Sequence, residues 1–144
     1  MRRCENYATK LWQILRNQHY KRAMERVQVE KFGLEDSQYR RGNKVWKASS
    51  LIAWCKAKEY PVFDMPLCCA DLSIEAFEFN TLDNFIFQMF RVQGCSLDYP
   101  IILDDLGQIA DGYHRVCKAI LQGRKTIKAI RIQEMPAYDL IEDE

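Results

Sequence analysis

The stretch "PIILDDLGQIADGYHRVCKAILQGRKTIKAIRI", residues 100–132, decides the fold that this sequence predicts. Two short apolar runs, residues 100–103 and 108–110, are separated by an acidic turn that contains Gly107. Glycine supplies the positive φ that such a turn needs, so the two runs predict a β-hairpin.

A helix and a strand complete this stretch. Residues 113–122 have the apolar spacing of a helix, and Gly123 follows as a stop. Residues 125–133 alternate apolar and polar side chains, which is typical of a strand. The side chains expected inside are Val116, Ala119 and Ile120 of the helix and Ile127 and Ala129 of the strand.

Upstream, "TLDNFIFQMFRVQG", residues 81–94, is the clearest helix signal in the chain. Its apolar residues recur at i, i+3, i+4, i+7 and i+8. Thr81 is a good N-cap, and Gly94 is expected to end the helix in a left-handed conformation. The stretch "YPVFDMPL", residues 60–67, contains two prolines and predicts an edge strand.

The N-terminal third has a different texture. Residues 4–31 predict a long helix, a polar loop follows, and residues 44–58 predict a second, shorter helix. The expected fold class is α+β. A small mixed sheet with packed helices occupies residues 46–144, and a basic helical N-terminal extension, residues 1–45, precedes it.

Composition favours one globular domain, because the 144 residues are 48% hydrophobic and 28% charged. No apolar run is long enough for a transmembrane helix, and no apolar stretch near the N-terminus suits a secretory signal. We therefore expect a cytoplasmic protein without a membrane partner, with six reduced and mostly buried cysteines. Their spacings do not match a zinc site.

Charge is distributed unevenly along the chain. Residues 1–60 carry 14 Lys/Arg and 6 Asp/Glu, whereas residues 61–144 carry 7 and 14. The basic half can contact DNA, RNA or an acidic protein. Alternatively, it pairs with the acidic half of its own fold or of a second copy, which would give a homodimer. The acidic tail, residues 138–144, is expected to fray.

The chemistry-bearing residues Asp111, Gly112, His114 and Arg115 stand where the hairpin leads into the helix. A phosphate suits that place, because the first N–H groups of a helix lack internal partners and the helix dipole is positive there. Gly112 allows close approach to the backbone, and Arg115 can hold phosphate oxygens. His114 can donate to phosphate or move a proton near neutral pH. Asp111 can orient His114, hold a metal ion or accept a proton.

Ordinary turn chemistry offers another interpretation of the same residues. Asp-Gly is common in turns, and Asp111 could cap the helix while His114 and Arg115 stay solvated. Two cations in a first helical turn are mildly unfavourable unless an anion or a carboxylate compensates them. From the residues alone, an anion site and a plain turn remain alternatives.

The segment 100–132 resembles the ParB/sulfiredoxin-like domain family. That family has a strand that begins with proline, a turn with glycine, an "(I/V)-D-G-x-H-R" motif before a helix, and a final "T-(I/V)-x-A-(I/V)" strand. The stretch "FDMPLCCADL" resembles its opening strand, so the similarity covers about residues 60–134. The matching residues are Pro100, Asp104, Gly107, Ile109, Asp111, Gly112, His114, Arg115, Ala119, Gly123, Thr126, Ile127 and Ala129.

The resemblance implies a nucleotide-binding protein that takes ATP or CTP with Mg²⁺. It implies phosphate contacts from Gly112, Tyr113, His114 and Arg115, catalytic roles for His114 and Asp111, and Mg²⁺ on Asp111. The family includes CTP-hydrolysing partition proteins, sulfiredoxins that use ATP, and free-serine kinases. Glu75, in "LSIEAF", lies near the place where the serine kinases carry a glutamate and is the candidate base.

The sequence also departs from the family. Tyr113 stands where a sulfiredoxin has a cysteine, so sulfiredoxin activity is not expected. The partition proteins of this family carry a helix-turn-helix domain and a dimerisation tail after the last strand, and we do not expect a full partition protein here. We expect a nucleotide-phosphate-binding protein that, if active, is an NTP hydrolase or a small-molecule kinase. The alternative is a non-catalytic module for DNA, RNA or a host protein, as in phage or mobile-element regulators and inhibitors.

Overall fold

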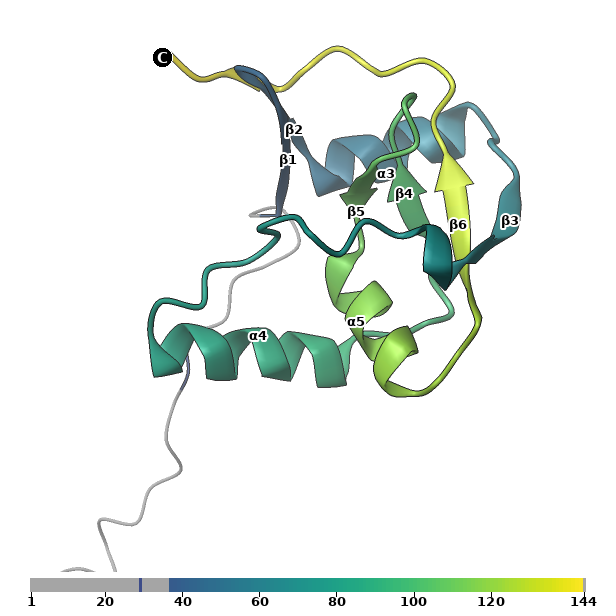
Figure 1. The fold of residues 1–144 in the computed structure, drawn as a ribbon. Helices are drawn as coiled ribbons and strands as arrows, with labels where there is room; N and C mark the ends of the chain where they lie inside the picture. Colours follow the sequence, from purple (N-terminus) through teal and green to yellow (C-terminus); the bar gives the residue numbers. More distant parts are fainter. Residues whose placement is uncertain (1–28, 30–36, 144) are drawn as a thin grey trace, which may run out of the picture.

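The computed structural model describes Val29 and residues 37–143 of this chain. These residues form a small mixed α+β fold with helices packed on a four-stranded sheet and a second, three-stranded sheet beside it (Figure 1). The predicted fold class is confirmed at this level. The predicted helix over residues 4–31 lies outside the described residues. Within the described part, no helix has the length and apolarity that crossing a membrane requires.

The four-stranded sheet follows the sequence prediction closely. Its order is β3 (Val62–Pro66), β6 (Thr126–Arg131), β4 (Ile101–Leu103) and β5 (Ile109–Asp111). The β4–β5 hairpin is antiparallel, and Gly107 in its turn has φ +85°, as predicted. Strand β3 lies at the sheet edge, as the two prolines around it predict.

Helix α5 (Tyr113–Leu121) connects β5 to β6, which runs parallel to β4. Gly123 has φ +68° just after the helix, so its predicted role as a stop is confirmed. Val116 and Ala119 are buried as expected, whereas Ile120 is 40% exposed and the prediction for it is wrong. Ile120 follows Ala119 by 100° around the helix, so the sheet covers only one of the two.

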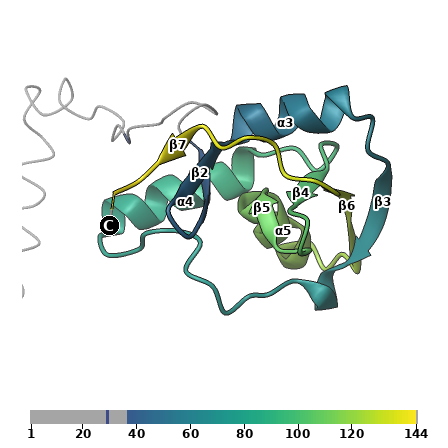
Figure 2. The same ribbon diagram turned by 90° about the horizontal axis from the view of Figure 1, so that it is seen from above.

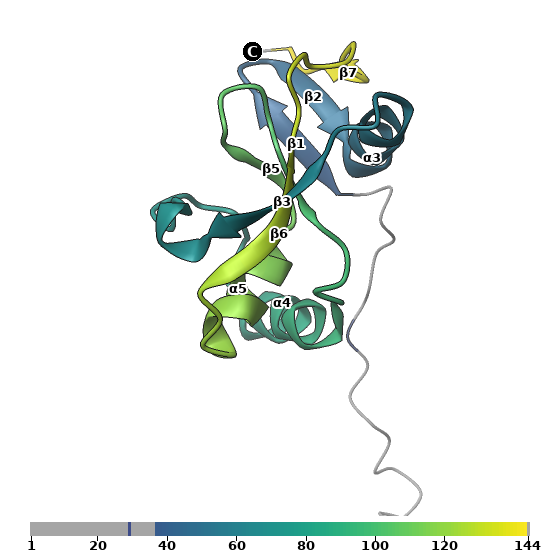
Figure 3. The same ribbon diagram turned by 90° about the vertical axis from the view of Figure 1, so that its right-hand side faces the viewer.

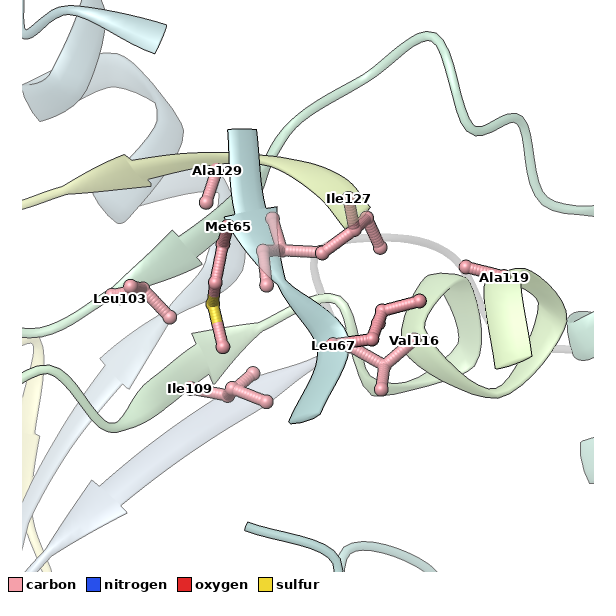
Figure 4. Close-up of a cluster of buried hydrophobic side chains, with 9 residues drawn as sticks. Met65, Leu67, Leu103, Ile109, Val116, Ala119, Ile127 and Ala129 are labelled. Atoms are coloured by element: carbon pink, nitrogen blue, oxygen red, sulfur yellow. The ribbon is translucent and has the colours of Figure 1, made fainter. Parts of the chain in front are cut away.

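Alternating side chains of the sheet build two cores. Ile101, Leu103 and Ile109 pack with α5 on one face, and Figure 4 shows this cluster around Met65 and Leu67. Ile102 and Ala110 face the other way, toward α3 (Ala48–Ala57). Figure 3 shows α3 and α5 on opposite sides of the sheet. The period of two in the strands therefore serves both faces.

Helix α4 (Leu82–Gly94) has the predicted N-cap, because the hydroxyl of Thr81 accepts a hydrogen bond from the Asn84 N–H at 3.1 Å. Its buried residues are Phe87, Gln88 and Val92, whereas members of the predicted apolar stripe are exposed, Leu82 by 74%. The periodicity therefore identified the helix but marked the side that its neighbours do not cover. Gly94 is not in the left-handed region, and the helix ends on the extended residue Cys95.

The polar stretch before the second helix was predicted as a loop, and this prediction is wrong. Strands β1 (Gln38–Arg41) and β2 (Lys44–Lys47) form a hairpin that turns at Gly42, with φ +62°. Helix α3 begins only at Ala48, because the hairpin holds residues 44–47 extended. The division expected at residue 45 falls inside β2.

The tail that was expected to fray contributes strand β7 (Leu140–Ile141), which pairs with β2. Figure 2 shows this segment crossing back over the molecule toward β2. The Trp46 indole N–H donates to the Pro136 carbonyl at 2.9 Å, and Asp139 accepts from the Lys47 N–H at 2.7 Å. Contacts from some 90 residues upstream therefore order the tail.

One buried carboxylate joins the two sheets. Asp104 is fully buried, and its Oδ1 accepts the N–H groups of Leu106 and Gln108 at 2.9 and 2.8 Å. Its Oδ2 accepts the Tyr39 hydroxyl at 2.6 Å and the Arg41 guanidinium at 3.2 Å. The hydrogen bond to Asp104 and the burial of the phenol raise the pKa of Tyr39, with burial the larger cause.

Cysteine burial differs from the sequence prediction. Five cysteines lie in the described residues and all five are free. Cys55 is buried, Cys95 and Cys117 are half-buried, and Cys68 and Cys69 are exposed. The exposed pair stands in the short 3₁₀ turn Leu67–Cys69, which lies outside both cores except for Leu67.

Candidate functional site

All predicted site residues except Arg115 lie along one pocket of about 550 Å³. Its walls are residues 37–40 from β1, residues 74–78 of the loop before α4, the middle of α4, and residues 110–114. The last wall is the β5–α5 junction, so the N-terminus of α5 opens into the pocket. Sequence-distant elements therefore converge on the place where the charge cluster was found.

Gly112 is the N-cap of α5 and has φ +113°, a conformation that L side chains rarely adopt. A Cβ atom there would lie 2.5 Å from Ile101 Cγ2 and 2.9 Å from Arg115 Nη2. The backbone thus packs against β4 on one side while it lines the pocket on the other. Only glycine fits this junction, which explains why the sequence has it.

The charge of Arg115 is compensated inside the protein. Its Nη2 donates to Asp111 Oδ2 at 2.7 Å, and the two side chains are 18% and 14% exposed. The turn interpretation had Asp111 cap the helix, and the structure shows no such cap. Arg115 Nε is buried without a hydrogen-bond partner among the described residues, and Arg115 is not part of the pocket wall, whereas Asp111 is.

His114 is held by two neighbours. Its Nε2 donates to Gln88 Oε1 at 2.7 Å, and its ring stacks on Phe77 with centroids 4.3 Å apart. Burial lowers the pKa of His114 to about 4, and the charges of Arg91 and Arg115 add to this shift. The ring is therefore neutral at pH 7, with its lone pair on Nδ1. A pKa this low makes His114 a poor proton carrier near neutral pH, because its imidazolium form is scarcely populated there.

Tyr113 has a structural contact in addition to its place on the pocket wall. Its hydroxyl donates to the Ile109 carbonyl at 2.8 Å, and burial raises the pKa of the phenol to about 12. The ring also meets Phe77 edge-on, with centroids 6.2 Å apart. Tyr113 thus ties the start of α5 to the strand before it, and its backbone N–H remains in the first turn of the helix.

Arg91 is one of several pocket residues that the sequence did not predict, Gln88 and Arg40 among them. It lies on α4, lines the pocket, and its Nη2 donates to the Ser37 hydroxyl at 3.1 Å. Burial lowers the pKa of Arg91, and the nearby carboxylate of Asp111 opposes that shift. No local sequence signal marks Arg91, because its place in the pocket depends on how α4 packs against the rest of the fold.

Glu75 and Glu78 line the pocket from the loop before α4, and both are exposed. The structure therefore brings Glu75 to the same pocket as Asp111, Gly112, Tyr113 and His114. Arg115 is the one predicted site residue that lies behind the wall. The acidic and basic groups of the pocket come from different segments, since Arg91 belongs to α4.

No metal centre is preformed in the described residues. Among them, no three His, Cys, Asp or Glu side chains gather as a metal site would require. Asp111 already accepts a hydrogen bond from Arg115. Mg²⁺ on Asp111 stays a prediction, in which the phosphate groups of a nucleotide would supply further oxygen ligands.

Comparison with known proteins adds no relative. No family model matches the chain, and no curated protein and no solved structure matches it. We therefore argue the function from the pocket and its own residues.

Proposed function

We propose that this chain is a ParB/sulfiredoxin-like protein that binds the phosphate groups of a nucleotide in the pocket at the N-terminus of α5. The observation that carries the proposal is the opening of this helix end into a pocket of about 550 Å³. That volume suits a ligand of nucleotide size. The unpaired N–H groups and the positive dipole end favour an anion there.

Arg91 supports an anionic ligand beside the helix end. A guanidinium keeps its charge even where burial lowers its pKa, and it can hold a phosphate through two hydrogen bonds. We assign to Arg91 the phosphate contact that the motif suggested for Arg115. Arg115 then positions Asp111 through their 2.7 Å ion pair.

His114 would respond to the ligand. A phosphate next to the ring favours the imidazolium and raises its pKa from about 4. Nδ1 could then donate to a phosphate oxygen while Nε2 keeps its hydrogen bond to Gln88. The pocket therefore couples phosphate binding to protonation of one histidine.

The order of elements also supports the family. An edge strand, a helix, a hairpin, a helix and a last strand follow one another as β3, α4, β4–β5, α5 and β6. This is the order that the resemblance implies, with "DGYHR" at the hairpin-to-helix junction.

Hydrolysis or transfer of the terminal phosphoryl group is a separate part of the proposal. Glu75 is exposed on the pocket wall and is the carboxylate that would accept the proton of the attacking hydroxyl or water. Asp111 would hold Mg²⁺ on the phosphates, since phosphoryl transfer needs its developing charge neutralised.

Nucleotide binding is tested by calorimetry with ATP, CTP, GTP and ADP, with and without Mg²⁺. We expect Arg91→Gln to weaken binding about tenfold or more, because one charge-assisted contact is lost. Arg124→Gln is the control, since Arg124 is exposed beyond the C-terminal end of α5 and lies outside the pocket wall. Absence of binding of all four nucleotides to the wild-type chain would refute the proposal.

A binding module without chemistry is the second candidate. Residues 1–28 carry seven Lys/Arg and two Asp/Glu, a charge that suits DNA, RNA or an acidic protein. Such binding weakens steeply with salt. Retention on DNA and RNA columns at rising salt tests it, and elution at low salt from both would exclude nucleic acid.

A further inference from the structure

The start of α4 and the loop before it expose a group of large apolar side chains. Leu72 is 67% exposed, Phe79 51%, Leu82 74% and Phe85 46%. We call residues 71–85 the acidic apolar face, because the same stretch also holds the carboxylates described next. Exposed apolar groups that gather in this way mark interaction sites rather than ordinary surface.

The apolar members of this face are continuous. Phe79 meets Phe85 of α4 with ring centroids 6.1 Å apart, and it meets Phe77 edge-on at 5.8 Å. Leu82 lies three residues before Phe85 on the same side of the helix. A hollow of about 330 Å³ beside them is lined mostly by apolar side chains, including Leu72 and Phe79. One apolar surface thus spans the loop and the helix.

The charge of the face has one sign. Asp71, Glu75, Glu78 and Asp83 stand among the apolar residues, and residues 68–90 contain no Lys or Arg. A partner that covers this face must bring apolar side chains together with positive charge.

Residues 1–28 of the same chain have that chemistry. They carry seven Lys/Arg against two Asp/Glu, and their sequence spacing gathers Tyr7, Leu11, Ile14 and Leu15 into a partial apolar stripe. We infer that this basic N-terminal segment docks on the acidic apolar face of its own chain. The inference does not depend on nucleotide binding.

The connection between segment and face is short enough. Ser37 is held on α4 by Arg91, and Leu82 lies nine residues before Arg91, about 14 Å along the helix. Residues 28–37 span at most about 30 Å when extended. The segment is thus tethered next to the face, and tethering raises its local concentration to about the millimolar range. A separate basic protein that binds the same face would not have this raised local concentration.

Hydrogen–deuterium exchange of the full chain tests the docking, with peptides from residues 4–27 as the readout. We expect Leu82→Lys to speed exchange in these peptides about tenfold, because it removes an apolar contact and repels a basic segment. The matched control is Leu121→Lys, since Leu121 is equally exposed, at 76%, and α5 ends on the side of the molecule away from the start of α4 (Figure 1). Exchange of β6 peptides reports whether each variant is folded.

A second pair of variants tests the charge. Glu78→Lys should speed exchange in residues 4–27, whereas Glu134→Lys, an equal charge change at an exposed site after β6, should not. Equal exchange of residues 4–27 in the wild type and in both face variants would overturn the inference. So would a dimer, seen in sedimentation, that Leu82→Lys dissociates, because a second copy would then be the occupant.

Discussion

Asp104 and Asp111 stand at opposite ends of the β4–β5 hairpin. A glycine with positive φ follows Asp111 directly, as Gly112, and follows Asp104 three residues later, as Gly107. Asp104 is fully buried and accepts four hydrogen bonds, from two backbone N–H groups, Tyr39 and Arg41. Asp111 is 14% exposed, has Arg115 as its ion-pair partner, and borders a pocket. One end of the hairpin therefore holds a buried carboxylate that connects the two sheets, whereas the other end borders an open pocket.

An aspartate followed closely by a glycine therefore does not by itself indicate whether the position is structural or part of a ligand site. Both aspartates match the pattern of the resembled family, and both have a nearby arginine. The difference comes from what packs over them. The β1–β2 hairpin covers Asp104, whereas near Asp111 the same hairpin forms only one wall of the pocket.

Replacement of Asp104 should have the largest effect on the free energy of unfolding. Asp104→Ala should lower the free energy of unfolding by about 4 kcal/mol, because it leaves Tyr39, Arg41 and two buried N–H groups without their acceptor. Urea unfolding followed by fluorescence measures it. A loss below about 1 kcal/mol would show that these hydrogen bonds to Asp104 are not formed in solution.

Gly112 and Gly107 should differ in how much unfolding free energy is lost when each is replaced by alanine. Gly112→Ala should cost about 3 kcal/mol, because it combines a positive φ with a Cβ that overlaps Ile101. Gly107→Ala should cost only about 1 kcal/mol, since it has the φ penalty and nothing within 4 Å of the new atom. Equal losses of unfolding free energy would mean that the packing of Gly112 on β4 is incorrect.

Acid should lower the free energy of unfolding through His114. Its folded pKa of about 4 lies below the ordinary value of 6.5, so the neutral form is favoured in the fold. This contribution is fully present above pH 6.5 and is lost as the pH falls toward 4. After allowance for partial solvent exposure, we expect a loss of about 1 kcal/mol between pH 7 and pH 4.

The variant His114→Gln isolates this contribution, because every other titratable residue is the same in both proteins. The wild type should lose more unfolding free energy than the variant over that pH range. Parallel curves of stability against pH would contradict the lowered pKa.

The smallest effect is expected at the ion pair itself. Asp111→Asn should strengthen ADP binding in EDTA about threefold, because Arg115 loses its compensating carboxylate. Asp105→Asn, on the same hairpin but outside this pocket, is the control. Weaker binding in EDTA would contradict the expected role of the pair.

Addition of Mg²⁺ to the same calorimetry tests the metal assignment. If Asp111 holds Mg²⁺, the wild type should bind ADP more tightly with the metal, and Asp111→Asn should lose that gain. A gain of equal size in both proteins would remove Asp111 as a ligand.

Local sequence signals predicted the elements whose contacts are near in the chain. Gly107 and Gly123 marked a turn and a helix end, and both have the positive φ that this requires. Thr81 capped α4 as expected. Strand β7 was missed because its pairing joins Ile141 to Lys44, and no local pattern reveals a partner that far away. The β1–β2 hairpin was missed although its turn at Gly42 is local, because its polar composition favoured a loop.

The sequence by itself determined the β4–β5–α5–β6 unit and the placement of Asp111, Gly112 and His114 at its hairpin-to-helix junction, because short-range backbone preferences and periodicity fix these features. Only the tertiary structure decided that Arg91 and Gln88 join them, that Asp111 neutralises Arg115, and that His114 is neutral. Burial and charge at a site depend on segments distant in the chain, such as α4 and the β1–β2 hairpin. Their positions follow from packing, which the local sequence does not encode.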